Sequence, residues 1–291
     1  MTPLFSHRVK FDLLKVGHCQ HAECAALRGG SRRAIDFPAL VGLIEHPHHG
    51  LMLYDTGYSR HFWDATRRFP ECLYRIVTPV QLPPEQELLA QLEARKISPA
   101  DIDTIFISHF HADHVAGLRD FPQARFIATQ AERQFVEKKG RIGRLRRAYL
   151  RELLPTDLDT RLTVAETTPR IDLPPSWQPF TQGHDLLGDA SMLGIDLPGH
   201  AASQLGLAFA AEGESAAIFL IGDAAWKIEG LEQNRPPSRL AYALFHDGKT
   251  YDTTFASLRA LHHAPQAPTL IPSHCATTWT ARGGTRHIHR D

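Results

Sequence analysis

The sequence of 291 residues has no long hydrophobic run, no net charge and no cysteine framework, and each absence argues against a class of protein. No apolar stretch approaches the roughly 20 residues that a membrane-spanning helix needs, so we expect no membrane span. Lys10 and Asp12 interrupt the first apolar residues, which argues against a secretory signal. These features favour a cytoplasmic location.

Charges of the two signs balance, with 32 Lys and Arg against 32 Asp and Glu. A chain without net charge is a poor candidate for electrostatic binding of nucleic acid, so we expect none. The four cysteines form neither a C-x-x-C pair nor a disulfide framework, and we interpret Cys19 and Cys24 as reduced thiols. What the sequence does contain in unusual number is histidine, with 18 residues.

Short apolar or alternating runs predict strands, and amphipathic runs predict helices. The predicted strands are 10–17, 37–46, 50–54, 103–108, 124–128, 191–197, 204–211, 216–221 and 269–271. The predicted helices are 85–96, one beginning near 130, 238–245 and 252–263. Strands interleaved with helices indicate sheets packed on each other with helices outside, in an α/β (α+β) fold. No break in composition marks a linker, so we expect a single domain over residues 1–291.

The stretch near 138–155 is strongly basic, yet Ile142, Leu145 and Tyr149 share a helical stripe. We therefore expect an inserted amphipathic helix there. Its basic residues are expected to form a solvated face rather than an anion-binding site.

The strongest chemical signal is Ser-His-Phe-His-Ala-Asp-His-Val-Ala-Gly, from Ser108 to Gly117, which follows a predicted buried strand. Four of its residues are the imidazoles and carboxylate that borderline divalent metals accept: His109, His111, Asp113 and His114. His109 and His111 point the same way in an extended chain, whereas the last two, as neighbours, point differently. One turn can therefore serve two adjacent metal positions.

Three further residues of ligand type come directly after apolar runs. They are His200 in Leu-Pro-Gly-His, Asp223 in Ile-Gly-Asp and His274 in Pro-Ser-His. Each of these motifs alone is weak evidence for a metal site, because Gly-His and Gly-Asp pairs are common in turns. Together they complete a candidate ligand set.

In their order along the chain, these motifs and Asp55-Thr56-Gly57 resemble the metallo-β-lactamase-fold hydrolases, over nearly the whole sequence. The resemblance implies an αββα sandwich with a metal site at one edge of two facing sheets. It implies two divalent ions, with Zn²⁺ preferred over Fe or Mn. By the resemblance, the first ion would be held by His109, His111 and His200, the second by Asp113, His114 and His274, and both by Asp223. Asp55 would support the ligands from behind.

Five neutral imidazoles, two carboxylates, two divalent ions and a bridging hydroxide sum to about +1, so the implied site stabilises developing negative charge. The hydroxide bridging the two ions would attack a carbonyl or phosphoryl centre. By the resemblance, Asp113 would also orient this nucleophile and carry a proton, so it is the predicted catalytic residue.

Within the superfamily, the sequence is most similar to N-acyl-homoserine lactonases, on Leu187-Gly-Asp-Ala-Ser191 ahead of Gly199-His200. The implied reaction is the opening of an ester or lactone, with a quorum-quenching acyl-homoserine lactone as the leading candidate. Trp226 stands where such lactonases carry tyrosine, and an indole N–H can donate but cannot accept or titrate. We expect an apolar substrate wall of four aromatic side chains: Trp226, Phe62, Trp63 and Phe110.

Other functions fit the same motifs. A phosphodiesterase or a glyoxalase II-like thioesterase would use the same metal pair. An iron persulfide dioxygenase uses fewer ligands, so His114 and His274 argue against it. A non-enzymatic alternative is a signal-binding protein with a vestigial metal site. The expected partner is a small-molecule ester or lactone, and a homodimer is left open.

Overall fold

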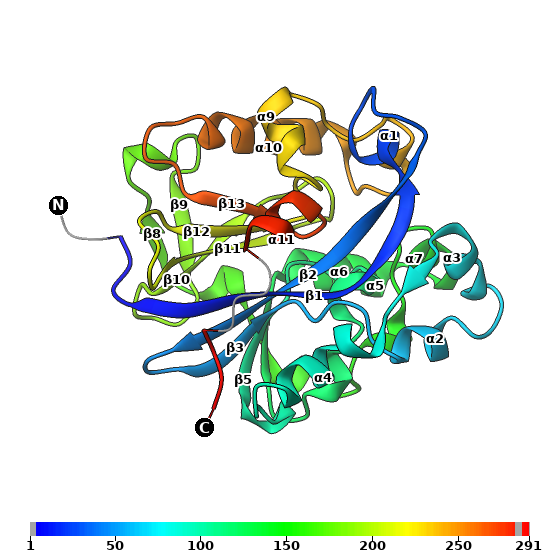
Figure 1. The fold of residues 1–291 in the computed structure, drawn as a ribbon, viewed down its shortest axis with the longest axis horizontal. Helices are drawn as coiled ribbons and strands as arrows, with labels where there is room; N and C mark the ends of the chain where they lie inside the picture. The colour runs from blue at the N-terminus through cyan, green and yellow to red at the C-terminus, as the bar shows by residue number, and fades with distance from the viewer. Residues whose placement is uncertain (1–3, 283–286, 291) are drawn as a thin grey trace.

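The computed structural model describes residues 4–282 and 287–290, and two β-sheets with helices outside them dominate its fold (Figure 1). The first sheet contains β1 (Arg8–Ala22), β2 (Ala34–His46), β3 (Gly50–Tyr54), β4 (Val80–Gln81), β5 (Ile102–Phe106), β6 (Arg125–Ala128) and β7 (Leu162–Val164). The second contains β8 (Arg170–Asp172), β9 (Gln182–Asp185), β10 (Met192–Asp196), β11 (Leu205–Ala211), β12 (Ile218–Gly222) and β13 (Thr269–Pro272). A short parallel pairing of β1 with β11 joins the two sheets.

The helices lie on the outer faces of the sheets. They are α1 (Glu23–Ala26), α2 (His61–Ala65), α3 (Cys72–Val77), α4 (Leu88–Glu93), α5 (Ala112–Val115), α6 (Gln130–Lys138), α7 (Arg141–Leu145), α8 (Leu158–Arg161), α9 (Ile228–Gln233), α10 (Gly248–His262) and α11 (Ala276–Arg282). In Figure 1, α9 and α10 lie above the second sheet and α4 lies below the first.

Strand residues are buried on both faces of each sheet, and their alternation builds the layers. In β3, Leu53 packs toward the helices of the first layer, while Met52 and Tyr54 pack between the two sheets. In β12, Leu220 faces the space between the sheets, and Phe219 packs under α9 and α10. Helix, sheet, sheet and helix therefore follow in order, which confirms the predicted αββα sandwich.

The predicted strands are confirmed within a few residues at their ends, and β3 has the predicted bounds. A tight turn joins β2 and β3 as a hairpin, because His46 pairs with Gly50 across it.

Three helix predictions were wrong in extent. The helix predicted over 85–96 is a 3₁₀ turn at Pro84–Gln86 followed by α4, because Glu87 between them is extended. Residues 238–245 contain only a 3₁₀ turn at Ala241–Ala243. The basic stretch is not one helix, because α7 ends at Leu145 and the backbone of Ala148 is left-handed, with φ 57°. A residue with positive φ cannot continue a right-handed helix.

Candidate metal centre

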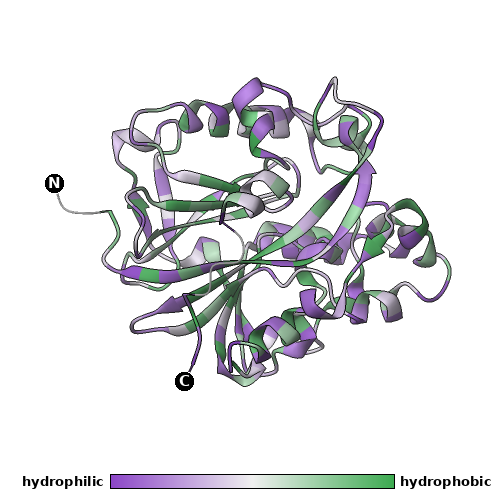
Figure 2. Ribbon diagram, viewed as in Figure 1, coloured by the Kyte–Doolittle hydropathy of each residue, from purple (hydrophilic) through white to green (hydrophobic). Residues whose placement is uncertain are grey.

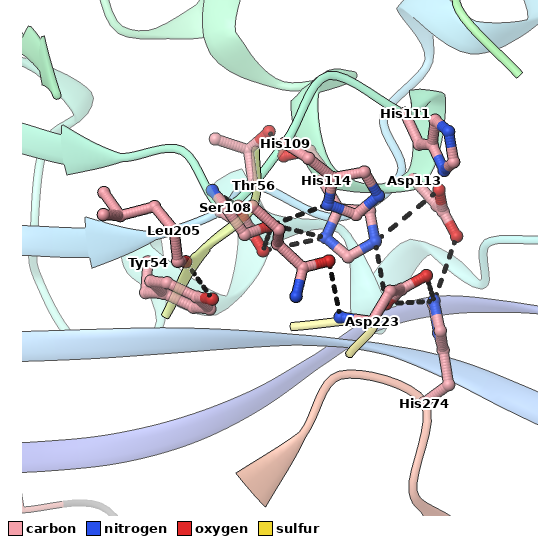
Figure 3. A network of polar contacts seen from close by, with 12 residues as sticks. Tyr54, Thr56, Ser108, His109, His111, Asp113, His114, Leu205, Asp223 and His274 are labelled. Atoms are coloured by element: carbon pink, nitrogen blue, oxygen red, sulfur yellow. Dashed lines mark hydrogen bonds and ion pairs between the residues drawn. The ribbon is translucent and has the colours of Figure 1, made fainter. Parts of the chain in front are cut away.

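Four strands deliver the predicted ligands to one place. The segment His109–His114 follows β5, His200 follows β10, Asp223 follows β12 and His274 follows β13. All seven side chains meet in two adjoining groups. Figure 3 shows all of them except His200. One group is His109, His111, His200 and Asp223; the other is Asp113, His114 and His274. Six of the seven are buried, and Asp113 is the partly exposed exception.

Imidazole rings form the first group. The ring centres of His109 and His111 are 4.4 Å apart, and each lies within 5 Å of the ring of His200. His200 Nε2 is 3.1 Å from His111 Nδ1. At this distance one ring can donate an N–H to the other, and a cation bound between the two nitrogens would replace that proton.

Asp223 lies between the two groups. Its carboxylate oxygens are 3.2 Å from His200 Nε2, 3.3 Å from His114 Nε2 and 3.1 Å from His274 Nε2. His274 Nε2 is also 3.4 Å from Asp113 Oδ2. The Asp223 carboxylate therefore contacts members of both groups, as the bridging position requires.

Asp55 orients His114, a member of the second group, by a hydrogen bond on the side away from the centre. Its Oδ2 accepts a hydrogen bond from His114 Nδ1 at 2.8 Å, and its Oδ1 accepts one from the backbone N–H of Ser108 at 2.8 Å. The Pro38 carbonyl accepts a similar bond from His274 Nδ1 at 2.8 Å. With the proton on Nδ1, each ring presents the lone pair of Nε2 to the centre.

A glycine lets the His200 loop approach α10. Gly199 has φ 124°, and a Cβ there would lie 2.3 Å from the backbone nitrogen of Tyr251. Only glycine fits this position, which explains the Pro-Gly-His pattern after β10.

Burial and charge set the protonation of the ligands. Burial, assisted by the neighbouring imidazoles, lowers the pKa of His109 well below its usual range, and burial lowers that of His111 to about 4. Burial also acts on His114, but the carboxylates of Asp223, Asp55 and Asp113 outweigh it and hold its pKa well above the usual value. Burial raises the pKa of Asp223, yet His274, His114 and His200 more than offset it, so the carboxylate stays ionised. A divalent cation would replace the protons that these charges otherwise attract.

The donor set fits divalent metal ions. Among the described residues, Nε2 of His109 is buried without a hydrogen-bond partner, and Nε2 of His114 and Oδ1 of Asp223 are buried with only ion-pair contacts inside the centre. Leaving buried polar atoms unpaired is costly, and such atoms converging on one point are what a bound cation satisfies. Imidazole and carboxylate donors suit Zn²⁺ and similar ions.

The centre lies at the floor of a cavity of about 1000 Å³, whose lining includes His111, Asp113, His200, Asp223 and His274. Trp226 lines this cavity as predicted, and its indole N–H donates to Asp223 Oδ2 at 3.0 Å. The indole N–H of Trp226 therefore hydrogen-bonds a candidate metal ligand and is not free to bind a substrate.

The other three residues of the predicted aromatic wall do not line the cavity. Phe62 and Phe110 are buried in the core under the first helical layer, and Trp63 packs against that core. None of the three lines the cavity. The prediction was wrong because Phe62 packs on Trp63 and Tyr74, with ring centres 5.6 and 5.4 Å away, so its ring points inward.

Two residues of the site were not predicted. Tyr58 lines the cavity, and its buried hydroxyl has no hydrogen-bond partner among the described residues other than the thiol of Cys19. Glu132 of α6 is buried and accepts a hydrogen bond from the backbone N–H of Ala202, two residues after His200, at 2.7 Å. Tyr58 could have been predicted from its position, because it directly follows the Asp-Thr-Gly motif. Glu132 lies in no motif, so the sequence gives no indication of its role.

A second histidine cluster has a different character. His46, His49 and Asp189 bring their polar atoms together at the β2–β3 turn. However, His46 Nδ1 accepts hydrogen bonds from the backbone N–H of His48 and of His49, each at 3.1 Å. Its proton is therefore on Nε2, facing Asp189 Oδ2 at 3.9 Å. No lone pair is free on that nitrogen, so this cluster stabilises a turn and does not offer His46 to a metal.

Comparisons with known proteins agree with this geometry. The family model of the metallo-beta-lactamase superfamily matches residues 34–261. The chain therefore belongs to the metallo-beta-lactamase superfamily, and its His and Asp centre is of the kind found in dinuclear hydrolases of that family.

Named relatives are more specific. N-acyl homoserine lactonase AiiB of Rhizobium rhizogenes is 27% identical over 229 residues, which cover 79% of this chain and 76% of the relative. A mutant of B. thuringiensis AiiA, solved with N-decanoyl-L-homoserine at its active site, superimposes with TM-score 0.70 at 17% identity, covering 94% of this chain and 97% of that one. AidC, a dizinc quorum-quenching lactonase, gives TM-score 0.61 at 15% identity, covering 92% and 88%. These structures share the fold.

Proposed function

We propose that the chain is a zinc-dependent lactonase that opens the ring of an N-acyl-homoserine lactone or a closely related apolar ester. The observation that carries this proposal is the position of the seven-residue centre at the floor of an apolar cavity. The names of the relatives support the substrate class.

In this proposal, His109, His111 and His200 hold one ion, Asp113, His114 and His274 hold the other, and Asp223 contacts both. When bound, the ions supply an activated water as nucleophile and an electrophile for the carbonyl oxygen. Every assigned atom is close to its group in the structure.

Asp113 has a second proposed role, in proton transfer. Its carboxylate lines the cavity and is partly exposed, so it faces both the centre and a bound substrate. It is placed to accept the proton of the attacking water and to return it to the alkoxide that leaves when the ring opens. Asp223, buried on the other side, keeps its negative charge throughout.

Tyr58 supplies a donor to the substrate. Burial, with the charges of Cys19 and Asp113, raises the pKa of its phenol well above the usual value, so the hydroxyl keeps its proton. The indole N–H of Trp226 already donates a hydrogen bond to Asp223, so it is not available to the substrate. Tyr58 therefore takes the part of the lactonase tyrosine that this sequence lacks after Asp223, by donating to an oxygen of the substrate.

A substrate panel tests the proposal. Initial rates of the zinc-loaded protein are compared on short- and long-chain acyl-homoserine lactones, a glyoxalase-type thioester and bis(p-nitrophenyl) phosphate. We expect the highest kcat/KM on a lactone and an increase with acyl length, because the cavity lining is mostly apolar. A higher value on the phosphodiester or thioester than on any lactone would overturn it.

A further inference from the structure

Exposed hydrophobic side chains gather at the mouth of the cavity. Eight large hydrophobic residues are exposed in the described part of the chain. Four of them line the cavity, three more lie in segments that contribute lining residues, and Leu89 lies in α4, which contributes none. The other seven are Phe69, Leu73, Ile76, Val77, Ile142, Leu240 and Leu244. Ile76 and Leu240 expose 72% and 88% of their surface. Exposed hydrophobic residues gathered in one region mark an interaction site.

Four segments line the cavity, and we call them the mouth segments: 23–33, 67–78, 138–148 and 238–246. The last three carry the seven exposed hydrophobic residues. The segments contact one another in pairs. Arg141 bonds both the carboxylate of Glu71 and the carbonyl of Phe69, which ties α7 to the segment of α3. The backbone N–H of Ser238 donates to the carbonyl of Ala25 at 3.0 Å. The segments thus form two pairs, both of which line the cavity, and together we call them its rim.

The rim is strongly positive, although the whole chain is neutral. The mouth segments contain 13 of the 32 Lys and Arg residues and only two of the 32 Asp and Glu residues. One of those two acids, Glu71, is already paired with Arg141. The guanidinium groups of Arg67, Arg68 and Arg146 are exposed and form no ion pair with any described residue. Figure 2 shows hydrophobic and hydrophilic residues interspersed along α3 and α7.

We propose that the mouth segments bind the anionic surface of a phospholipid membrane, with the cavity opening toward the bilayer. Exposed aliphatic and aromatic side chains among Lys and Arg are the combination that interfacial binding requires, because apolar area and attraction to anionic lipid add. No helix among the described residues is long and apolar enough to cross a membrane, so the contact is peripheral.

Charge complementarity favours a membrane over a second copy of the chain. A symmetric dimer through this face would bring two rims of the same positive sign together, and like charges across an interface are costly. An anionic lipid surface offers the opposite sign over the whole rim.

The apolar path continues from the rim into the cavity. Leu73, Val77 and Leu240 are exposed and also line the cavity, so an acyl chain would leave the bilayer without crossing a polar barrier. This last consequence rests on the proposed lactonase function, whereas the docking itself does not.

Vesicle flotation of the full chain tests the docking. Vesicles of phosphatidylcholine alone are compared with vesicles of phosphatidylcholine and phosphatidylglycerol, at low and high salt. The key variant is Ile76→Ser with Ile142→Ser, because both side chains are exposed and neither lines the cavity. Leu89→Ser is the matched control, an exposed leucine outside the mouth segments.

We expect the wild type to float only with vesicles that contain phosphatidylglycerol, and less at high salt. The double variant should bind about tenfold or more weakly, because it loses two exposed aliphatic side chains that docking would bury in the lipid, and Leu89→Ser should bind like the wild type. Hydrolysis of a short-chain lactone should be equal in all three proteins, which separates this proposal from the lactonase proposal. Docking is refuted if the wild type does not float, or if both variants weaken binding equally. It is also refuted if the wild type is a dimer that the double variant dissociates, without vesicle binding.

Discussion

The hydrogen-bonding of each histidine's second nitrogen decides whether its ring can bind a metal ion. His114 donates from Nδ1 to Asp55, so the lone pair of Nε2 faces the centre. His46 is equally buried, but its Nδ1 accepts two backbone N–H groups, so Nε2 carries the proton. Metal-ligand capacity therefore depends on the neighbouring donors and acceptors as much as on residue type.

Replacing Asp113 by Asn tests its double role. The change keeps the shape of the side chain and removes both a metal-binding charge and a proton acceptor, so kcat should fall by about 10² or more. Steady-state kinetics and metal analysis of the same preparation provide the readout. Asp64→Asn, an exposed residue of α2, should leave both unchanged. Near-normal turnover of Asp113→Asn would mean that another residue moves the proton.

Tyr58→Phe removes the phenol hydroxyl at the cavity. Because this hydroxyl has no hydrogen-bond partner among the described residues other than the thiol of Cys19, a weak partner, the thermal midpoint should hardly change. If it binds the substrate carbonyl, kcat/KM for a lactone should fall about twofold to tenfold, the effect of one hydrogen bond. Tyr242→Phe, whose hydroxyl bonds Asp252, is the matched control and should keep full activity. A fall in stability with unchanged kcat/KM would assign Tyr58 to packing.

Single residues differ in how far sequence predicts them. The seven candidate ligands were predictable because each follows a strand in a short motif of fixed order. The inward positions of Phe62 and Phe110 were not, because apolar aromatic side chains suit a core and a substrate wall equally. Only their packing on residues distant in sequence distinguishes the two.

Secondary-structure elements show the same division. The longer strands were predictable because both faces are buried, which gives apolar runs of strand length. The short strands β4, β7, β8 and β9 were not predicted. The helix over 138–155 was not predictable, because its apolar stripe is helical while the left-handed Ala148 breaks it. A tertiary contact explains the break, since the carbonyl of Ala148 accepts a hydrogen bond from the backbone N–H of Ala112, beside His111.

Helix α6 acts on the centre through Glu132. Burial raises the pKa of its carboxyl to about 8, from an ordinary value of 4.5, although backbone N–H groups of Ala202, Ser203 and Phe110 favour the charged form. Between these two values the folded protein holds one more proton at this site than the unfolded chain. This site therefore makes the free energy of unfolding decrease as pH rises through that window.

Glu132→Gln should remove this pH dependence. Urea unfolding of wild type and variant, from about pH 5 to pH 8, should show the variant gaining stability relative to the wild type as pH rises. Glu137→Gln, on the exposed side of the same helix, should not reproduce the trend. A constant difference between Glu132→Gln and wild type would contradict the raised pKa.

At the scale of the whole molecule, the four-layer fold brings the ends of β5, β10, β12 and β13 to one site. Strands from both sheets contribute, so neither sheet alone could form both ligand groups. The chain is electrically neutral as a whole, but its charge is concentrated by sign, with a positive rim around the cavity. The net charge of the whole chain therefore gives no indication of the positive rim, because the fold brings its basic residues together from separate segments.

A zinc titration tests the central claim most directly. Metal-free protein is loaded stepwise with Zn²⁺, and hydrolysis of a long-chain acyl-homoserine lactone is measured at each step, with circular dichroism confirming that the protein stays folded. Because Asp223 contacts both ligand groups, we predict that two ions bind per chain and that full activity requires both. Full activity at one ion per chain, or no lactone hydrolysis by folded protein carrying two, would contradict the account.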